Sequence, residues 1–344
     1  MEHQGGNLTA TATPSLRQPR LSPTARVRLL QVGGVVAFLI FWQVFGATRP
    51  EWYSQPTRML DDTWHMFTVD KVLPYIEGSF WTMALKSLGA LGIGLLISFI
   101  VGVTIGFLVG RYRAAQVIFD PYLAALYSVP RVAFVPMLVI WFGIASKMTV
   151  WGIGIPLSKF VIASVVMSSA VLISFSTAAG VSETMKQYDE VATALHLRGN
   201  SRGLFGTARN AVLTLVGGII VAVVGAAVFG GIWPFMFFAM FLLVALLYQD
   251  RRMFMKILLP GSVPFIATGL RFSLQRSLVA VIVAEFLVGV PGVGFIIRDA
   301  RAASDVDRLF AMAILLMFVG VVVVQVTKRI EARLSSWRPQ AFGP

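Results

Sequence analysis

The stretch LGALGIGLLISFIVGVTIGFLV, residues 88–109, contains no charged side chain. A helix of about 20 such residues is long enough to cross the roughly 30 Å of hydrocarbon in a lipid bilayer. Three further uncharged stretches have a similar length, and they cover residues 29–47, 160–179 and 309–327. The chain is therefore expected to be an all-α integral membrane protein.

The composition of the whole chain supports the same class. Hydrophobic residues make up 57% of the 344 residues and charged residues 13%, whereas a soluble domain has about 25% charged residues. The chain has no cysteine, which excludes a disulfide framework, a cysteine nucleophile and a thiolate metal site. It also has no P-loop or H-E-x-x-H motif, so no catalytic residue, metal site or cofactor is expected in this chain.

Two more apolar stretches are interrupted by polar residues. Residues 121–144 carry Arg131 next to Pro130, and residues 272–297 carry Arg276 and Glu285. Neither flank of these stretches offers another apolar run of sufficient length. Both are therefore predicted to be spans with a kink or a polar face.

Residues 211–249 are uncharged and are broken in the middle by Gly230, Gly231 and Pro234. Two full crossings need about 40 residues, so a tight transmembrane pair and a shallower re-entrant pair are both compatible with this length. We expect two short spans here, which brings the total to eight crossings.

The basic residues set the expected orientation. Of the 29 Lys and Arg, 17 fall in the predicted inner segments and seven in the outer segments. This bias indicates that both termini are cytoplasmic. The basic residues occur as short flanks and form no concentrated patch, so the lipid bilayer is the expected partner and nucleic acid is not.

The two ends of the chain are expected to be tails. Residues 1–28 have no apolar period and predict a disordered cytoplasmic tail. Residues 29–47 show no small-residue cleavage site and are expected to remain as the first transmembrane helix. Residues 338–344 form a second cytoplasmic tail.

Glycines on residues 88–109 and just beyond indicate a close helix contact. Gly102, Gly106 and Gly110 recur at four-residue spacing and share one helix face. Such a face allows another backbone to approach.

The inner segment VSETMKQYDEVATALHLRGNSRG, residues 181–203, has the pattern of an amphipathic helix. Val191 and Leu195 share one face, while Ser182 and Glu183 are suited to a helix start. The pattern alone predicts a connector that lies along the membrane surface.

The stretch KILLPGSVPFIATGLRFSLQRSLVAVIVAEFLV, residues 256–288, carries a resemblance to a known family. It closely resembles the membrane subunit of ABC importers, the binding-protein-dependent permeases, in their nitrate, sulfonate and taurine branch. The matching positions are Ile257, Leu259, Pro260, Gly269, Leu270, Arg271 and Glu285. With weaker matches at 120–121, 128–131, 141–143, 188–192 and 291–294, the resemblance defines a permease domain over residues 80–337.

The chain departs from the family pattern in two places. Within the family's cytoplasmic loop, Val191 stands where the family has Ala, and His196 stands where it has Gly, with Gly199 as a displaced substitute. The uncharged residues 211–249 also separate the two halves of that loop. The resemblance thus implies six family-like spans plus an inserted hairpin.

The resemblance implies a transport subunit of the bacterial inner membrane that pairs with itself. ATP and Mg would bind to separate cytoplasmic ABC ATPase subunits, and an external or periplasmic solute-binding protein would deliver a small anionic or organic solute. The segment 181–203 would be the coupling helix that lies in a groove of the ATPase. Its rim would be Asp189 and Glu190, its apolar anchor Val191, Ala192 and Leu195, and its end Gly199.

Among the ionisable residues in or next to the predicted spans, four are candidates for a solute path or a buried ion pair, and they are Lys159, Arg271, Arg276 and Glu285. Such residues are costly in hydrocarbon unless they are paired or hydrated. One interpretation is structural, with an Arg and a Glu pairing between helices, or with Arg271 extending to the cytoplasmic edge of the membrane. The other is that Arg276 or Lys159 lines the path of an anionic solute.

Two other function classes remain open at this point. An ion-coupled secondary transporter could use Glu285 as its proton or cation site. A membrane scaffold would have no solute path at all.

Overall fold

The computed structural model describes residues 23–69, 78–143, 147–150, 153–194 and 254–334, together with Gly218 and Phe241. The chain divides into two units, residues 1–59 and residues 60–344.

The first unit contains α1 (Pro23–Thr48) and the start of α2 (Pro56–Thr68). The side-chain amide of Gln43 donates to Gln55 Oε1 at 3.0 Å, and its oxygen accepts the Thr57 N–H at 3.3 Å. One side chain of α1 therefore closes the connection to α2. The prediction of a disordered tail over residues 1–28 is wrong for residues 23–28, and residues 1–22 lie outside the described residues.

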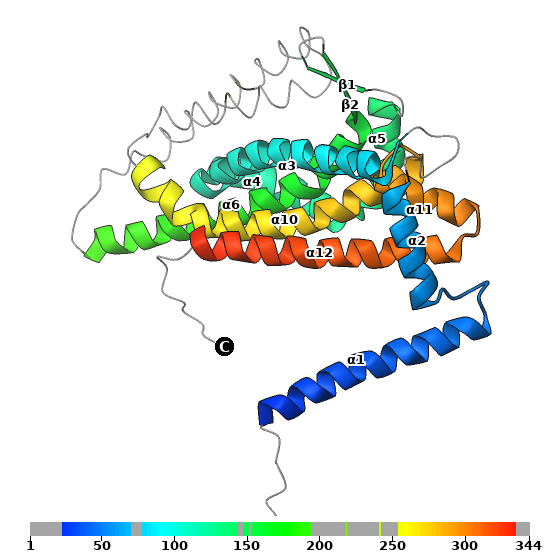
Figure 1. The fold of residues 1–344 in the computed structure, drawn as a ribbon. Coiled ribbons are helices and arrows are strands. Elements are labelled where there is room, and N and C mark those ends of the chain that lie inside the picture. The colour runs from blue at the N-terminus through cyan, green and yellow to red at the C-terminus, as the bar shows by residue number, and fades with distance from the viewer. Residues whose placement is uncertain are drawn as a thin grey trace, which may run out of the picture. The chain divides into compact units, whose positions relative to one another are not determined.

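The second unit is built on four long helices, α3 (Phe80–Arg111), α6 (Lys159–Ala194), α10 (Leu259–Val288) and α12 (Val306–Leu334). As Figure 1 shows, they run side by side: α6 packs against both α3 and α10, and α10 also packs against α12. The fold is the expected all-α transmembrane bundle.

Glycines bring α3 and α6 into backbone contact. A Cβ atom added to Gly102 would lie 2.8 Å from the carbonyl oxygen of Ala170, and one added to Gly106 would lie 2.6 Å from that of Ser174. At Gly110 the corresponding distance to the Ala178 carbonyl oxygen is 2.7 Å. The glycines and the facing carbonyls recur at the same four-residue spacing. The predicted glycine seam is confirmed.

Small polar residues form the contact between α6 and α10. The hydroxyls of Ser169 and Ser277 contact each other, and the Ser273 hydroxyl donates to the Ser169 carbonyl at 3.2 Å. A Cβ added to Gly269 would lie 2.6 Å from Cβ of Ser176. Small side chains and interhelical hydrogen bonds are the usual means of helix association in a membrane, where apolar burial contributes little.

The predicted span over residues 121–144 is broken in the structure. It consists of α4 (Arg113–Ser128), the short 3₁₀ helix η1 (Arg131–Phe134) and α5 (Val135–Phe142). The two arms are bent by 93°, which fits a broken span or a re-entrant loop. Pro130 lacks an N–H and holds Val129 in an extended conformation, with φ −77° and ψ 133°, so the helix cannot continue.

The predicted span over residues 272–297 has the wrong bounds. A π-helical turn, η2 (Phe254–Leu258), leads directly into α10, which begins at Leu259 and ends at Val288. A separate helix, α11 (Val293–Ala302), follows. Gly289 adopts a left-handed conformation with φ 77° and donates its N–H to the Glu285 carbonyl, which terminates α10.

A small antiparallel hairpin precedes α6 and adds β structure to the helical bundle. It pairs β1 (Lys147–Val150) with β2 (Ile153–Ser158). Leu157, at the end of β2, packs against Gly89 of α3. The hairpin thereby joins one end of the bundle.

Among the described residues, five helices are long and apolar enough to cross a membrane: α1, α3, α6, α10 and α12. The bent pair of α4 and α5 would make a sixth. The predicted hairpin at residues 211–249 lies outside the described residues except for Gly218 and Phe241, and so does the tail at 338–344.

Candidate functional site

Glu285 lies on the last turn of α10 and is almost fully buried. Its two carboxylate oxygens are 2.7 and 2.9 Å from the Ser87 hydroxyl of α3. Oε2 also accepts the Gly294 N–H at 2.9 Å, while the Val293 N–H donates to Ser87 Oγ at 2.9 Å. The carboxylate and the hydroxyl therefore satisfy the first N–H groups of α11.

The glycines around Glu285 leave room for this arrangement. A Cβ on Gly292 would lie 2.2 Å from the Glu285 carboxylate, and one on Gly294 would lie 2.3 Å from the Ile282 carbonyl oxygen. A carboxylate at a helix N-terminus is also favoured by the helix dipole. Within the described part of the chain Glu285 forms no ion pair, and its contacts are those of a cap that joins α3, α10 and α11.

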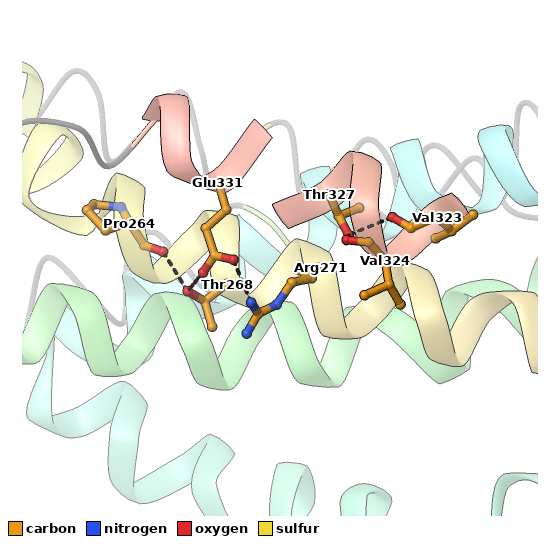
Figure 2. A network of polar contacts seen from close by, with 7 residues as sticks. All are labelled: Pro264, Thr268, Arg271, Val323, Val324, Thr327 and Glu331. Carbon is orange, nitrogen blue, oxygen red and sulfur yellow. Dashed lines mark hydrogen bonds and ion pairs between the residues drawn. The ribbon is translucent and has the colours of Figure 1, made fainter. Parts of the chain in front are cut away.

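Arg271 is paired with a residue that the sequence did not single out. Its Nη1 lies 2.8 Å from Glu331 Oε2 of α12, as Figure 2 shows. The Thr268 hydroxyl lies 2.6 Å from Glu331 Oε1 and 3.0 Å from the Pro264 carbonyl. The predicted Arg–Glu pair between helices is thus present, but it joins Arg271 to Glu331 and leaves Glu285 out.

Arg276 is in a different environment. Its side chain is exposed, and its guanidinium carbon lies 5.5 Å from the centre of the Tyr127 ring of α4. The Tyr127 ring in turn packs edge-on against Phe175 of α6, with 5.8 Å between ring centres and 79° between ring planes. Phe175 therefore fixes the ring that holds the arginine.

The four ionisable residues lie at different levels of the bundle. Lys159 is the first residue of α6 and is half-buried. The Ser168 hydroxyl contacts the Arg276 carbonyl at 3.5 Å, and Gly269, near Arg271, packs against Ser176. Along α6, Ser168 is about 14 Å from Lys159 and Ser176 is about 26 Å from it. Arg276 and Arg271 lie near these two levels. The structure does not gather the four residues into one site.

The segment 181–203 begins differently from the expectation. No helix starts at Ser182 or Glu183, because α6 continues without a break to Ala194. Asp189 and Glu190 are exposed, and the Val191 side chain is 59% exposed. Ala192 lies within the helix, whereas Leu195 and Gly199 lie outside the described residues.

A further charged cluster, away from the predicted sites, joins α2 to the start of α12. Arg308 Nε lies 3.8 Å from Asp62 Oδ2 and 3.6 Å from Asp305 Oδ2. Burial raises the pKa of the Asp62 carboxyl, and nearby Arg308 opposes this by lowering the pKa. The cluster holds the Leu60–Thr68 part of α2 to the helical bundle.

Ser87, Tyr127 and Glu331 were missed by the sequence analysis. Ser87 and Glu285 are 198 positions apart, and Glu331 is 60 positions from Arg271. A single sequence carries no signal for contacts between such distant positions. Gly292 and Gly294 are the local feature of the sequence that fits a backbone close to Glu285.

Comparison with known proteins gives one family match and several similar permeases. The model of the family described as binding-protein-dependent transport system inner membrane component matches residues 245–336, which include α10, α11 and α12. This part of the chain is similar to that family. Together with the relatives described next, the match indicates a multi-pass inner-membrane permease subunit of an ABC importer, which works in transport and not as an enzyme.

Several permeases are similar to the chain over most of their length. The bicarbonate transport system permease protein CmpB of Synechococcus elongatus is 25% identical, over 90% of this chain and 88% of the relative. The nitrate import permease protein NrtB of Leptolyngbya laminosa is 24% identical, over 93% and 96%. The taurine transport system permease protein TauC of Escherichia coli is 20% identical, over 92% of each chain. The resemblance to the nitrate, sulfonate and taurine branch is confirmed.

Proposed function

We propose that this permease pairs with a second copy of itself and that the two copies together form the solute path. Two cytoplasmic ABC ATPase subunits that bind ATP and Mg would drive it, and an external solute-binding protein would supply it. The similarity of residues 245–336 to binding-protein-dependent transport components supports both kinds of partner. The excess of basic residues in the predicted inner segments supports cytoplasmic termini.

The end of α6 is the proposed contact with the ATPase. α6 has 36 residues, so it is about 54 Å long, whereas the hydrocarbon core is about 30 Å thick. Its last turns extend past the ends of α3 and α12 in Figure 1. The exposed Asp189, Glu190 and Val191 on this extension are the observation that carries the proposal.

The packing of α6 suggests how movement of its end by the ATPase is transmitted to the other membrane helices. α6 contacts α3 through the glycine seam and α10 through the serine contacts. A displacement of its cytoplasmic end must therefore move α3 and α10 as well. Rigid-body motion of packed helices is a common way to alternate access to a solute site.

The solute is proposed to be a small anionic or organic molecule. The similar permeases are named for bicarbonate, nitrate and taurine transport. The choice among such solutes is assigned to the binding protein. Use of Glu285 as a proton or cation site has no support from the geometry, since its carboxylate caps α11.

Replacement of Glu190 by Arg tests the proposed contact. We expect Glu190→Arg to reduce co-purification of the ATPase and ATP-driven uptake about tenfold or more, since it reverses a charge at the interface. Membrane insertion should be unchanged. Glu51→Arg, an exposed acidic position in the first unit, serves as the control and should retain the ATPase. Normal uptake and ATPase retention by Glu190→Arg would refute the contact.

A further inference from the structure

Arg276 lies deep within a membrane-spanning helix. It is 17 residues after Leu259 and 12 residues before Val288, the two ends of α10. These separations correspond to about 26 Å and 18 Å along the helix. On α6 its backbone contacts Ser168, which is near the middle of the uncharged residues 160–179. The guanidinium therefore belongs to the middle of the bilayer and not to its edges.

The position of Arg276 is unfavourable if it faces lipid. Arginines near helix ends can extend to the headgroups, but one in the middle of a span requires a partner or water. Within the described part of the chain, acidic partners are present for Arg271 and Arg308 but not for Arg276. A cavity that contains water would favour its charge.

The surroundings of Arg276 favour one kind of ligand. The Tyr127 ring lies beside the guanidinium and is itself fixed by Phe175. A guanidinium has five N–H donors in one plane and matches the oxygens of a flat or tetrahedral anion. Since its side chain is exposed, it can offer N–H groups to a ligand while it stays in contact with the ring.

We propose that Arg276, held against Tyr127, binds a small oxyanion, a carboxylate or a sulfonate as it passes through the permease. The inference rests on the proposed function, because it places the ligand in the solute path. It assigns a role to one of the four ionisable residues, since Glu285 is used as a cap and Arg271 is used in an ion pair.

The absence of cysteine allows a direct test of hydration. Arg276→Cys would be the only thiol in the chain, and a charged methanethiosulfonate reagent modifies only thiolates in contact with water. The matched control is Val321→Cys on α12, an exposed apolar position. In the complex with ATPase and binding protein, we expect residue 276 to react at least about tenfold faster. Equal rates at the two positions would overturn the proposal.

Transport by the same variants tests the charge. The probes are nitrate, bicarbonate and taurine, each labelled and added separately to proteoliposomes that contain the whole complex. Arg276→Gln should reduce uptake about tenfold or more, the effect of losing one charged hydrogen bond, while ATPase co-purification is retained. A cationic reagent on Arg276→Cys should restore part of the uptake, and an anionic reagent should not.

The remaining outcomes separate this inference from the proposed function. Arg276→Gln with wild-type uptake of the transported probe would overturn the anion site alone. Failure of the unmutated complex to show ATP-driven uptake of any solute would contradict the proposed function. Tyr127→Leu should raise KM more than Tyr127→Phe does, because only Tyr127→Phe keeps the aromatic ring beside Arg276. No difference between these two would overturn the role of the ring.

Discussion

Gly106 of α3 lies directly against the carbonyl oxygen of Ser174 of α6, so that an added Cβ atom would be 2.6 Å from this oxygen. Backbone atoms on the facing helix cannot rotate away as a long side chain can. The contact therefore requires a residue without a side chain at position 106.

Replacement of Gly106 by Ala should destabilise the bundle by about 1 to 3 kcal/mol, because the extra methyl group must push the two helices apart. The measurement is thermal unfolding in detergent. Gly92→Ala is the matched control on the same helix, since an added Cβ there meets no atom within 4 Å. It should be neutral or slightly stabilising, as Ala favours helix more than Gly does. Equal effects at both positions would argue against the seam.

Removal of the Glu285 carboxylate should loosen α11. Glu285→Ala leaves the Gly294 N–H without its acceptor and removes the hydrogen bond from the Ser87 hydroxyl, which costs about 1 to 3 kcal/mol. Glu285→Gln retains an acceptor oxygen and should cost less. Hydrogen exchange at Gly294 and thermal unfolding give the readouts. If Glu285→Gln abolished uptake with stability unchanged, Glu285 would instead be an ion-binding residue.

The Arg271–Glu331 pair should show coupling in a double-mutant cycle. Arg271→Met and Glu331→Gln should each lower stability, and their effects should be non-additive by about 0.5 to 3 kcal/mol, since the residues are in direct contact. Thermal unfolding of the two single variants and the double variant measures this. Strict additivity would show that the pair contributes nothing to the packing of α10 on α12.

Much of the fold could be predicted because a bilayer imposes simple requirements. Charge-free stretches of sufficient length predicted α1, α3, α6 and α12, and the four-residue spacing of glycines predicted which face of α3 makes close contact. These features depend on local composition and helix geometry alone.

Helix ends were harder to predict than helices. The end of α10 depends on the left-handed conformation of Gly289 and on the hydrogen bond that Glu285 accepts from α11. Neither feature can be recognised from the content of apolar residues. The segment 181–203 has a helix-start pattern at Ser182, yet the preceding helix continues through it, because nothing there forces a break. The sharp turn at Pro130 was expected only as a kink.

The candidate site could be predicted in kind but not in detail. Ionisable residues in an apolar span were recognised as important, yet their partners come from other helices. Arg271 and Glu331 are separated by 60 positions, so no sequence window contains both. Only the folded arrangement distinguishes the paired Arg271 from the exposed Arg276.

The equal spacing of glycines on α3 and carbonyls on α6 has a mechanical consequence. The three glycines of α3 and the three carbonyl groups of α6 have the same spacing along their helices. Sliding one helix along the other would therefore break all three close contacts at once. We therefore expect α3 and α6 to move together as one rigid body. Relative movement during the transport cycle is then expected at other connections, such as the 93° bend between α4 and α5 near Pro130.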